Sequence, residues 1–188
     1  LAVPGKNGGA YDKFRNRVMI PIKDPRGKIV GFTGRILGDG MPKYMNTGET
    51  EFFIKRYLLF GLDIAVNEIR KTRQAIVVEG HMDAISLHAA GVKNAVASMG
   101  TAFAAEQARL LKRMCDEVVF CYDSDNAGRN ASVRAVSIAR AAGLKVRVAG
   151  VPDGKDPDEF IRQHGKDAFL EVIKQGLDGI DYQVEETI

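Results

Sequence analysis

The sequence predicts an α/β protein: a parallel sheet flanked by helices, with a smaller β-rich lobe on its N-terminal side. Strands buried on both faces of a parallel sheet are almost continuously apolar. Runs of that kind alternate here with segments of helical periodicity, at residues 75–78, 95–98, 118–122 and 145–148. Two runs rich in β-branched residues precede them. Of the 188 residues, 45% are hydrophobic, which is enough for a core and excludes disordered and fibrous classes.

The N-terminal part contains mainly strand and turn signals. Residues 1–10 are rich in glycine, and we expect them to form an irregular lead-in. Residues 17–23 and 28–36 are predicted strands, and Pro25 followed by Gly27 between them is typical of a hairpin turn. A short extended piece is expected after the next loop, at residues 42–46.

The rest of the chain alternates the four apolar runs with predicted helices. Helices are expected at residues 62–71, 82–90, 104–114 and 127–142, and Gly143 ends the last of them. From this change of character we predict three parts: a basic β-rich part at 1–60, an α/β domain at 61–175 and a helical tail at 176–188.

Charge is distributed unevenly along the chain. Residues 1–60 carry a net charge of +6, residues 61–150 one of +3, and residues 151–188 one of −6. A basic N-terminal third suits a polyanionic ligand. The acidic end could serve a metal ion, or it could be the solvated face of a helix.

Cys115 and Cys121 are the two cysteines, and they show no CxxC spacing. This excludes a zinc ribbon within these residues and makes a disulfide framework unexpected. Two buried thiols suggest a reducing, cytoplasmic setting. No apolar stretch approaches the roughly 20 residues that a membrane helix needs, and no signal peptide is recognisable. Because the chain begins with Leu1 rather than Met, we expect it to be a piece of a longer protein.

Acidic residues follow the predicted strands at their carboxyl ends. Ligands of open parallel sheets bind at those ends, and six carboxylates are expected there: Glu79, Asp83, Asp123, Asp125, Asp156 and Asp158. Carboxylates that converge on one edge repel one another unless a cation lies between them. Mg²⁺ prefers oxygen ligands and commonly combines one or two carboxylates with substrate phosphates. The pattern therefore indicates a divalent-cation site.

Several of these acids also have a purely structural alternative. Asp156 followed by Pro157 is a good helix start. Asp125 or Asn126 could cap the helix that begins near residue 127. Asp83 lies where a first helical turn favours negative charge. Each signal is weak alone, but their joint order on successive strand ends favours a site.

The motifs resemble a known family. Residues 79–83 (EGHMD) and 122–128 (YDSDNAG) together resemble the Toprim domain, which primases, topoisomerases and some nucleases share. Further segments make the chain similar to the catalytic core of bacterial DnaG-type primases, namely residues 11–34, 42–46 (PKYMN), 119–129 and 153–158 (DGKDPD). The resemblance covers almost the whole chain and implies a Toprim-type, Rossmann-like parallel sheet.

The resemblance also implies roles for particular residues. The principal metal-binding acids would be Glu79, Asp123 and Asp125, with Mg²⁺ or Mn²⁺ as the ion and no zinc within this fragment. The acidic cluster would be completed by Asp83, Asp156 and Asp158, the last two also as metal ligands. Residues that line the family's basic groove and meet nucleotide phosphates would be Arg35, Lys43, Asn46 and Lys55. His81 replaces the family's usual aromatic residue; it could be a general acid or ligand, or a side chain that packs.

The implied function is a metal-dependent nucleotidyltransferase that makes short RNA primers from NTPs on single-stranded DNA for DNA replication. Its partners would be the DNA template, NTPs, the RNA primer and the replicative helicase, the last through a domain outside these residues. It would act in the bacterial cytoplasm at the replication fork, without a membrane. With no Trp and few aromatic residues, little base stacking is expected. Two alternatives remain: another Toprim enzyme, such as a topoisomerase or nuclease, or a non-catalytic Toprim module that binds metal or nucleotide.

Overall fold

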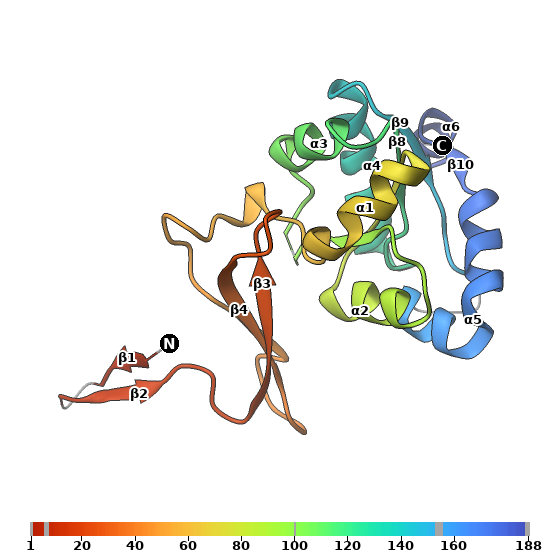
Figure 1. The fold of residues 1–188 in the computed structure, drawn as a ribbon. Coiled ribbons are helices and arrows are strands. Elements are labelled where there is room, and N and C mark those ends of the chain that lie inside the picture. The colour runs from red at the N-terminus through yellow and green to blue at the C-terminus, as the bar shows by residue number, and fades with distance from the viewer. Residues whose placement is uncertain (1, 6–7, 100, 153–155, 187–188) are drawn as a thin grey trace.

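A five-stranded sheet forms the centre of the larger part of the protein (Figure 1). The computed structural model describes residues 2–5, 8–99, 101–152 and 156–186. The strand order is β10-β9-β8-β6-β7, with β6 (Gln74–Val78), β7 (Ala95–Ala97), β8 (Glu117–Phe120), β9 (Lys145–Val148) and β10 (Leu177–Asp178). Strands β6 to β9 are parallel, and the short edge strand β10 is antiparallel to β9. The predicted α/β class with a parallel sheet is confirmed.

Helices cover both faces of this sheet because its strands are apolar on both sides. Val77, Val118 and Phe120 belong to one buried cluster, and Ile76 and Val119 to another. The first cluster includes residues of α1 (Leu62–Thr72), α3 (Ala105–Lys112) and α4 (Asn126–Ala141). The second includes residues of α2 (His81–Ala89) and α5 (Pro157–Lys174). A last helix, α6 (Gly179–Glu185), packs on the first cluster through Tyr182.

The N-terminal part contains a three-stranded antiparallel sheet of order β3-β4-β5. Asp24 determines its hairpin turn, because the Asp24 carboxylate accepts hydrogen bonds from the backbone N–H groups of Arg26 and Lys28, both at 2.9 Å. Gly27 supplies the positive φ of 84° that this turn requires. The strands are β3 (Arg17–Lys23), β4 (Ile29–Ile36) and β5 (Tyr44–Asn46).

The expectation of an irregular lead-in at residues 1–10 is wrong for residues 2–5 and 8–10, and residues 1, 6 and 7 lie outside the described part of the chain. Strands β1 (Ala2–Pro4) and β2 (Ala10–Asp12) pair as an antiparallel ribbon, which lies apart from the other sheets in Figure 1. The glycines that suggested disorder form the turn instead: Gly8 and Gly9 both have a φ near +80°, and the Gly5 N–H donates to the Gly9 carbonyl at 3.0 Å. A β-turn uses glycine for its dihedral angles, so glycine content alone does not indicate fraying.

Two sets of contacts attach the small sheet to the α/β part. Ile22, Phe53, Leu58 and Met99 form a buried apolar cluster between them. Beside it, the Lys23 ammonium lies 3.3 Å from a carboxylate oxygen of Asp63. These contacts position β4 and β5 relative to the carboxyl ends of the parallel strands. The division of the chain at residues 60 and 175 stays a prediction.

A 3-10 turn, η1 (Lys55–Tyr57), is fixed to α3. The fully buried Gln107 amide donates to the carbonyls of Lys55 at 3.3 Å and Leu58 at 2.7 Å. Next along the chain, Phe60 forms an isolated antiparallel bridge with Ala97, at the outer edge of β7. The segment from 55 to 60 is therefore held by the α/β part.

Both cysteines, Cys115 and Cys121, are free and buried, as the sequence predicts. Within the described ranges, none of the helices combines the length and the apolar character needed to cross a membrane.

Candidate active site

The strand order creates a crevice between the carboxyl ends of β6 and β8. The chain passes from β6 to β7 on one side and then returns to β8 and β9 on the other. At such a switch point the connections diverge, which leaves space for a ligand. Glu79 directly follows β6, and Asp123 lies three residues beyond β8. Two of the predicted acids therefore flank the crevice.

A polar hollow of about 340 Å³ lies at this edge of the sheet. It brings together seven of the ten residues predicted for the site: Arg35, Lys43, Glu79, Asp83, Asp123, Asp156 and Asp158. Tyr44, His81 and Arg162 also line it. The three other predicted residues do not: Lys55 lines a separate hollow, and neither Asn46 nor Asp125 is among the lining residues described.

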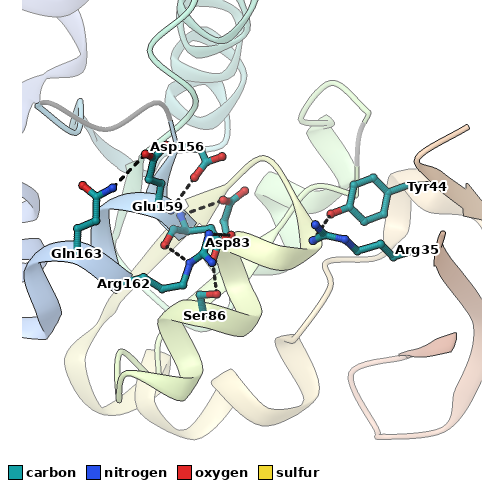
Figure 2. Close-up of polar contacts among 9 residues, drawn as sticks. Arg35, Tyr44, Asp83, Ser86, Asp156, Glu159, Arg162 and Gln163 are labelled. Carbon is teal, nitrogen blue, oxygen red and sulfur yellow. Dashed lines mark hydrogen bonds and ion pairs between the residues drawn. The ribbon is translucent and has the colours of Figure 1, made fainter. Parts of the chain in front are cut away.

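The basic side of the hollow comes from β4 and β5. Arg35 and Tyr44 are directly opposite each other in the register, so their side chains share a face. The Arg35 guanidinium donates to the Tyr44 hydroxyl at 3.1 Å, as Figure 2 shows. Arg17 supports the segment before β5, since its guanidinium donates to the Pro42 carbonyl at 2.8 Å. Two cationic side chains, of Arg35 and Lys43, thus face the acidic strand ends from a braced sheet.

Asp83 and Asp158 connect the first turns of α2 and α5. The Asp83 carboxylate accepts hydrogen bonds from the N–H groups of Gly80 at 2.9 Å and Asp158 at 3.1 Å. The Asp158 carboxylate in turn accepts a short hydrogen bond from the Ser86 hydroxyl and pairs with Arg162 at 2.8 Å. Burial raises the pKa of Asp83 to about 6. These two acids fix the geometry of the hollow through bonds within the protein.

The structural alternatives for Asp125 and Asp156 are realised. Of the two candidates at the start of α4, Asp125 is the cap, because its carboxylate accepts from the Gly128 N–H at 2.7 Å. Asp156 caps α5 by accepting from the Glu159 N–H at 2.7 Å. A cap uses one oxygen, so the second oxygen of each carboxylate remains chemically able to accept from a ligand.

Asp123 and Glu79 differ from the other acids in having raised pKa values without a fixed bonding role. One Asp123 oxygen, Oδ1, is buried and has no hydrogen-bond partner in the described part of the chain. Burial, followed by the charges of Asp83 and Glu79, raises the pKa of Asp123 to about 7. The pKa of Glu79 is also raised, first by burial and then by Asp125. In the part of the chain that the structure describes, neither carboxylate forms an ion pair.

The residues present fit a divalent cation that is completed by a substrate. Among residues 2–5, 8–99, 101–152 and 156–186, no three His, Cys, Asp or Glu side chains form a ready-made metal cage. Mg²⁺ does not require such a cage, because it usually takes one or two carboxylates together with water and phosphate oxygens. The orphaned oxygen of Asp123 beside Glu79 matches that donor set. The metal-ligand assignment stays a prediction.

The His81 ring packs against aromatic neighbours, although it also lines the hollow and its buried Nε2 has no hydrogen-bond partner among the described residues. Its ring meets the Phe60 ring edge-to-face at a centroid distance of 4.9 Å and lies 6.3 Å from the Tyr44 ring. Burial, and secondarily the charge of Lys55, lowers the pKa of His81 to about 4. A neutral imidazole between two aromatic rings matches the packing alternative.

Comparisons with known proteins agree with this architecture. The Toprim-like family profile matches residues 76–161, and the profile for the N-terminal domain of the DNA primase catalytic core matches residues 1–66. A DNA primase of Clostridium acetobutylicum is 49% identical over 180 residues, which are 95% of this chain and 30% of that protein. The chain belongs to the family of DnaG-type primase catalytic cores.

Solved primase cores have the same fold. A DNA primase domain from Pseudomonas aeruginosa superimposes with a TM-score of 0.91 at 42% identity, over 99% of this chain and 60% of that one. A DnaG primase catalytic domain bound to ssDNA gives a TM-score of 0.91 at 40% identity, over 98% and 61%. The DNA primase of Escherichia coli is 42% identical over 94% of this chain, which spans only 31% of that protein.

Two residues that line this primase core's hollow, Tyr44 and Arg162, were not predicted from sequence, and neither was Ser86, which bonds Asp158 beside it. Arg162 had a local signal, because it follows Asp158 by four residues on one helix. Tyr44 lies within the PKYMN segment, between two predicted site residues. Its position opposite Arg35 depends on the register between two strands, which the sequence does not give. The Ser86 contact joins residues 72 apart in sequence and has no local signal.

Asp156 both caps α5 and lines the hollow, and a substitution can separate these two roles. We expect Asp156→Asn to leave the melting temperature unchanged, because Asn is an equally good cap. Nucleotide incorporation should fall about tenfold or more, since the charge facing the hollow is lost. The matched control is Asp178→Asn, since Asp178 caps α6 by accepting from the Ile180 N–H at 2.8 Å and does not line the hollow. Unchanged incorporation in Asp156→Asn would restrict that residue to capping.

Proposed function

We propose that this chain is the nucleotidyltransferase core of a DNA primase, which joins NTPs into short RNA primers on single-stranded DNA. The observation that carries the proposal is the hollow in which Arg35 and Lys43 face Glu79 and Asp123 across a topological switch point. The relatives named DNA primase, and the related catalytic domain solved with ssDNA, support it. Contact with the replicative helicase stays a prediction.

The charge of the hollow explains why a divalent cation belongs to the proposal. Five carboxylates and three cationic side chains line it, so its net charge is −2 when all are ionised. A triphosphate is strongly anionic and would be repelled without a counter-ion. The proposed ligands are Glu79, Asp123 and Asp125, with Asp156 and Asp158 near them. When bound, Mg²⁺ or Mn²⁺ neutralises charge on the transferring phosphoryl group and polarises it.

The basic residues supply positioning. Phosphoryl transfer depends mainly on placing the reactants and stabilising charge. Arg35, held by its bond to the Tyr44 hydroxyl, presents a planar donor fork suited to phosphate oxygens. Lys43 adds a point charge on the same side of the hollow. Asn46 and Lys55 lie outside it and would meet parts of the substrate farther from the reacting phosphorus.

A primer-synthesis assay tests the proposal against the two alternatives. Wild-type protein is incubated with single-stranded DNA, labelled ribonucleotides and Mg²⁺. We expect short RNA products that require both the template and the metal. Cleavage or relaxation of DNA without ribonucleotide incorporation would favour another Toprim enzyme. Nucleotide or metal binding without either activity would favour a non-catalytic module.

Substitution of Lys43 distinguishes a nucleotide contact from a template contact. A triphosphate concentrates its charge in one place, whereas a template distributes its phosphates along a groove. We therefore expect Lys43→Ala to raise the KM for nucleotides about tenfold to a hundredfold, the effect of one charge-assisted contact. Affinity for single-stranded DNA should change little. Lys71→Ala is the control, since Lys71 is an exposed lysine on α1. A large loss of DNA affinity at unchanged KM would move Lys43 to the template groove.

A further inference from the structure

A second basic surface lies where η1 meets α3. A hollow of about 340 Å³ is lined there by Tyr57, Glu106, Arg109, Leu110 and Arg113. Tyr57 comes from η1, and the other four residues come from α3 and its C-terminal cap. Because Gln107 anchors η1 to α3, the two sides of this hollow are held in a fixed relation. We call Arg56, Tyr57, Arg109 and Arg113 the η1–α3 surface.

An exposed aromatic ring lies at the centre of this surface. The Tyr57 side chain is 47% exposed, although tyrosine usually buries most of its ring. The Arg56 guanidinium lies over the Tyr57 ring, 5.0 Å from its centroid, which is a cation–π contact on one face of the ring. The sequence expectation of little base stacking stays a prediction, and periodicity gives no indication of whether an isolated Tyr in a turn is exposed.

The arginines of the surface are largely free to bind an anion. In the described part of the chain, neither Arg56 nor Arg113 forms an ion pair. Among the described residues Arg109 pairs only with Glu106, at 3.5 Å, and its own side chain is 66% exposed, which weakens the pair. Arginine is suited to phosphate because its planar fork binds two oxygens at once.

The surface also adjoins the hollow that contains Lys55. Arg56 lines the larger hollow of about 670 Å³ that contains Lys55, Thr50 and Thr101. The three residues of η1 therefore connect a hollow with the predicted phosphate-binding Lys55 to the hollow around Tyr57. A linear ligand could contact both.

We propose that the η1–α3 surface binds single-stranded nucleic acid, with a base stacked on Tyr57 and backbone phosphates on Arg56, Arg109 and Arg113. A single strand offers an exposed π-face and a phosphate at every nucleotide, which matches an aromatic ring flanked by arginines. A protein partner fits less well, because Leu110 is the only aliphatic residue among the described residues that line the hollow, and protein interfaces have an apolar centre. The inference rests on the proposed primer synthesis only for the expectation that such a strand is present.

Fluorescence anisotropy with a labelled oligonucleotide tests this proposal without any catalysis. We expect Arg113→Gln to weaken binding about threefold to tenfold and to reduce the salt slope by about 1, the value for one lost phosphate contact. Glu106→Gln should strengthen binding, because it removes the one carboxylate of the hollow and frees Arg109. Lys174→Gln, which removes an exposed charge from the distant end of α5, is the control and should bind like wild type.

Stacking is tested at Tyr57 with a matched pair of ligands. Tyr57→Ala should lower affinity about tenfold, and Tyr57→Phe should not, because phenylalanine keeps the ring. On an abasic oligonucleotide of the same length, wild type and Tyr57→Ala should bind equally. If Tyr57→Ala lowers the affinity for the abasic strand by the same factor, Tyr57 does not stack on a base.

DNA and RNA oligonucleotides of one sequence distinguish the two possible strands. If the variants lose more affinity for the DNA strand, the surface is assigned to the template. If they lose more affinity for the RNA strand, it is assigned to the primer. If Arg113→Gln and Glu106→Gln both bind the two strands with the affinity of the wild-type protein, the proposal is wrong. If the wild-type protein binds single strands but makes no RNA, the proposed primer synthesis is wrong. The comparison of affinities between wild type and variants still tests the η1–α3 surface.

Discussion

Asp123→Asn is expected to abolish nucleotide incorporation, with a loss of about a thousandfold or more, while the protein stays folded. Among the charged side chains that line the hollow, Asp123 has a buried oxygen that accepts no hydrogen bond from any described residue. Loss of a ligand that holds a catalytic cation removes several kcal/mol of transition-state stabilisation. The measurement is primer synthesis at saturating nucleotide, with circular dichroism to verify the fold. Wild-type incorporation by Asp123→Asn would remove that residue from the proposed metal site.

The same substitution should also change how stability depends on pH. The pKa of Asp123 is raised to about 7 in the folded protein, whereas that of an unfolded Asp is about 3.9. Between these values the folded state binds the extra proton, so the contribution of Asp123 to the free energy of unfolding falls as pH rises from about 4 to 7. In the presence of a chelator, the melting temperature of Asp123→Asn relative to wild type should therefore increase from pH 4 to pH 8. A pH-independent difference would contradict this assignment.

Gly128→Ala is expected to damage both stability and activity. Gly128 lies in the first turn of α4, and a Cβ atom there would be 2.1 Å from the backbone oxygen of Asp123. Because the obstacle is backbone, the strand-to-helix turn must move. Overpacking of this kind costs about 1–3 kcal/mol, which lowers the melting temperature of a chain of this size by roughly 2–12 °C. Since the moving segment carries Asp123, incorporation should fall even well below the melting temperature.

The control for this prediction is Gly150→Ala. Gly150 follows β9 at the same edge of the sheet, and a Cβ atom there would meet nothing within 4 Å. We expect wild-type melting and incorporation for Gly150→Ala. If Gly128→Ala behaves in the same way, the close approach between α4 and Asp123 is not a constraint on the site.

The sequence predicts the parts of the site that depend on local signals. Apolar runs of four or five residues define the parallel strands, and Glu79 and Asp123 follow two of them closely. Because parallel strands end at a common edge, their proximity follows from the fold class. The caps at Asp125 and Asp156 were likewise visible, since a cap is defined by the few residues after it.

The remaining features depend on contacts between distant segments. The bond from the Asp158 N–H to Asp83 joins residues 75 apart, so no local pattern indicates that Asp83 connects α2 to α5. The separation of Lys55 from the hollow depends on Gln107, which holds η1 on α3 through residues about 50 apart. The N-terminal ribbon was missed for a different reason, because glycine has the same local signature in turns and in irregular chain.

The ends of the central sheet have a consequence for how this protein meets other chains. On one side, Phe60 occupies backbone groups at the outer edge of β7, and on the other, the two-residue β10 covers β9. A long, unpaired strand edge is a template for pairing with another polypeptide. Here that route is blocked on the first side and shortened to two residues on the second. Addition of a partner's strand to the central sheet is therefore disfavoured.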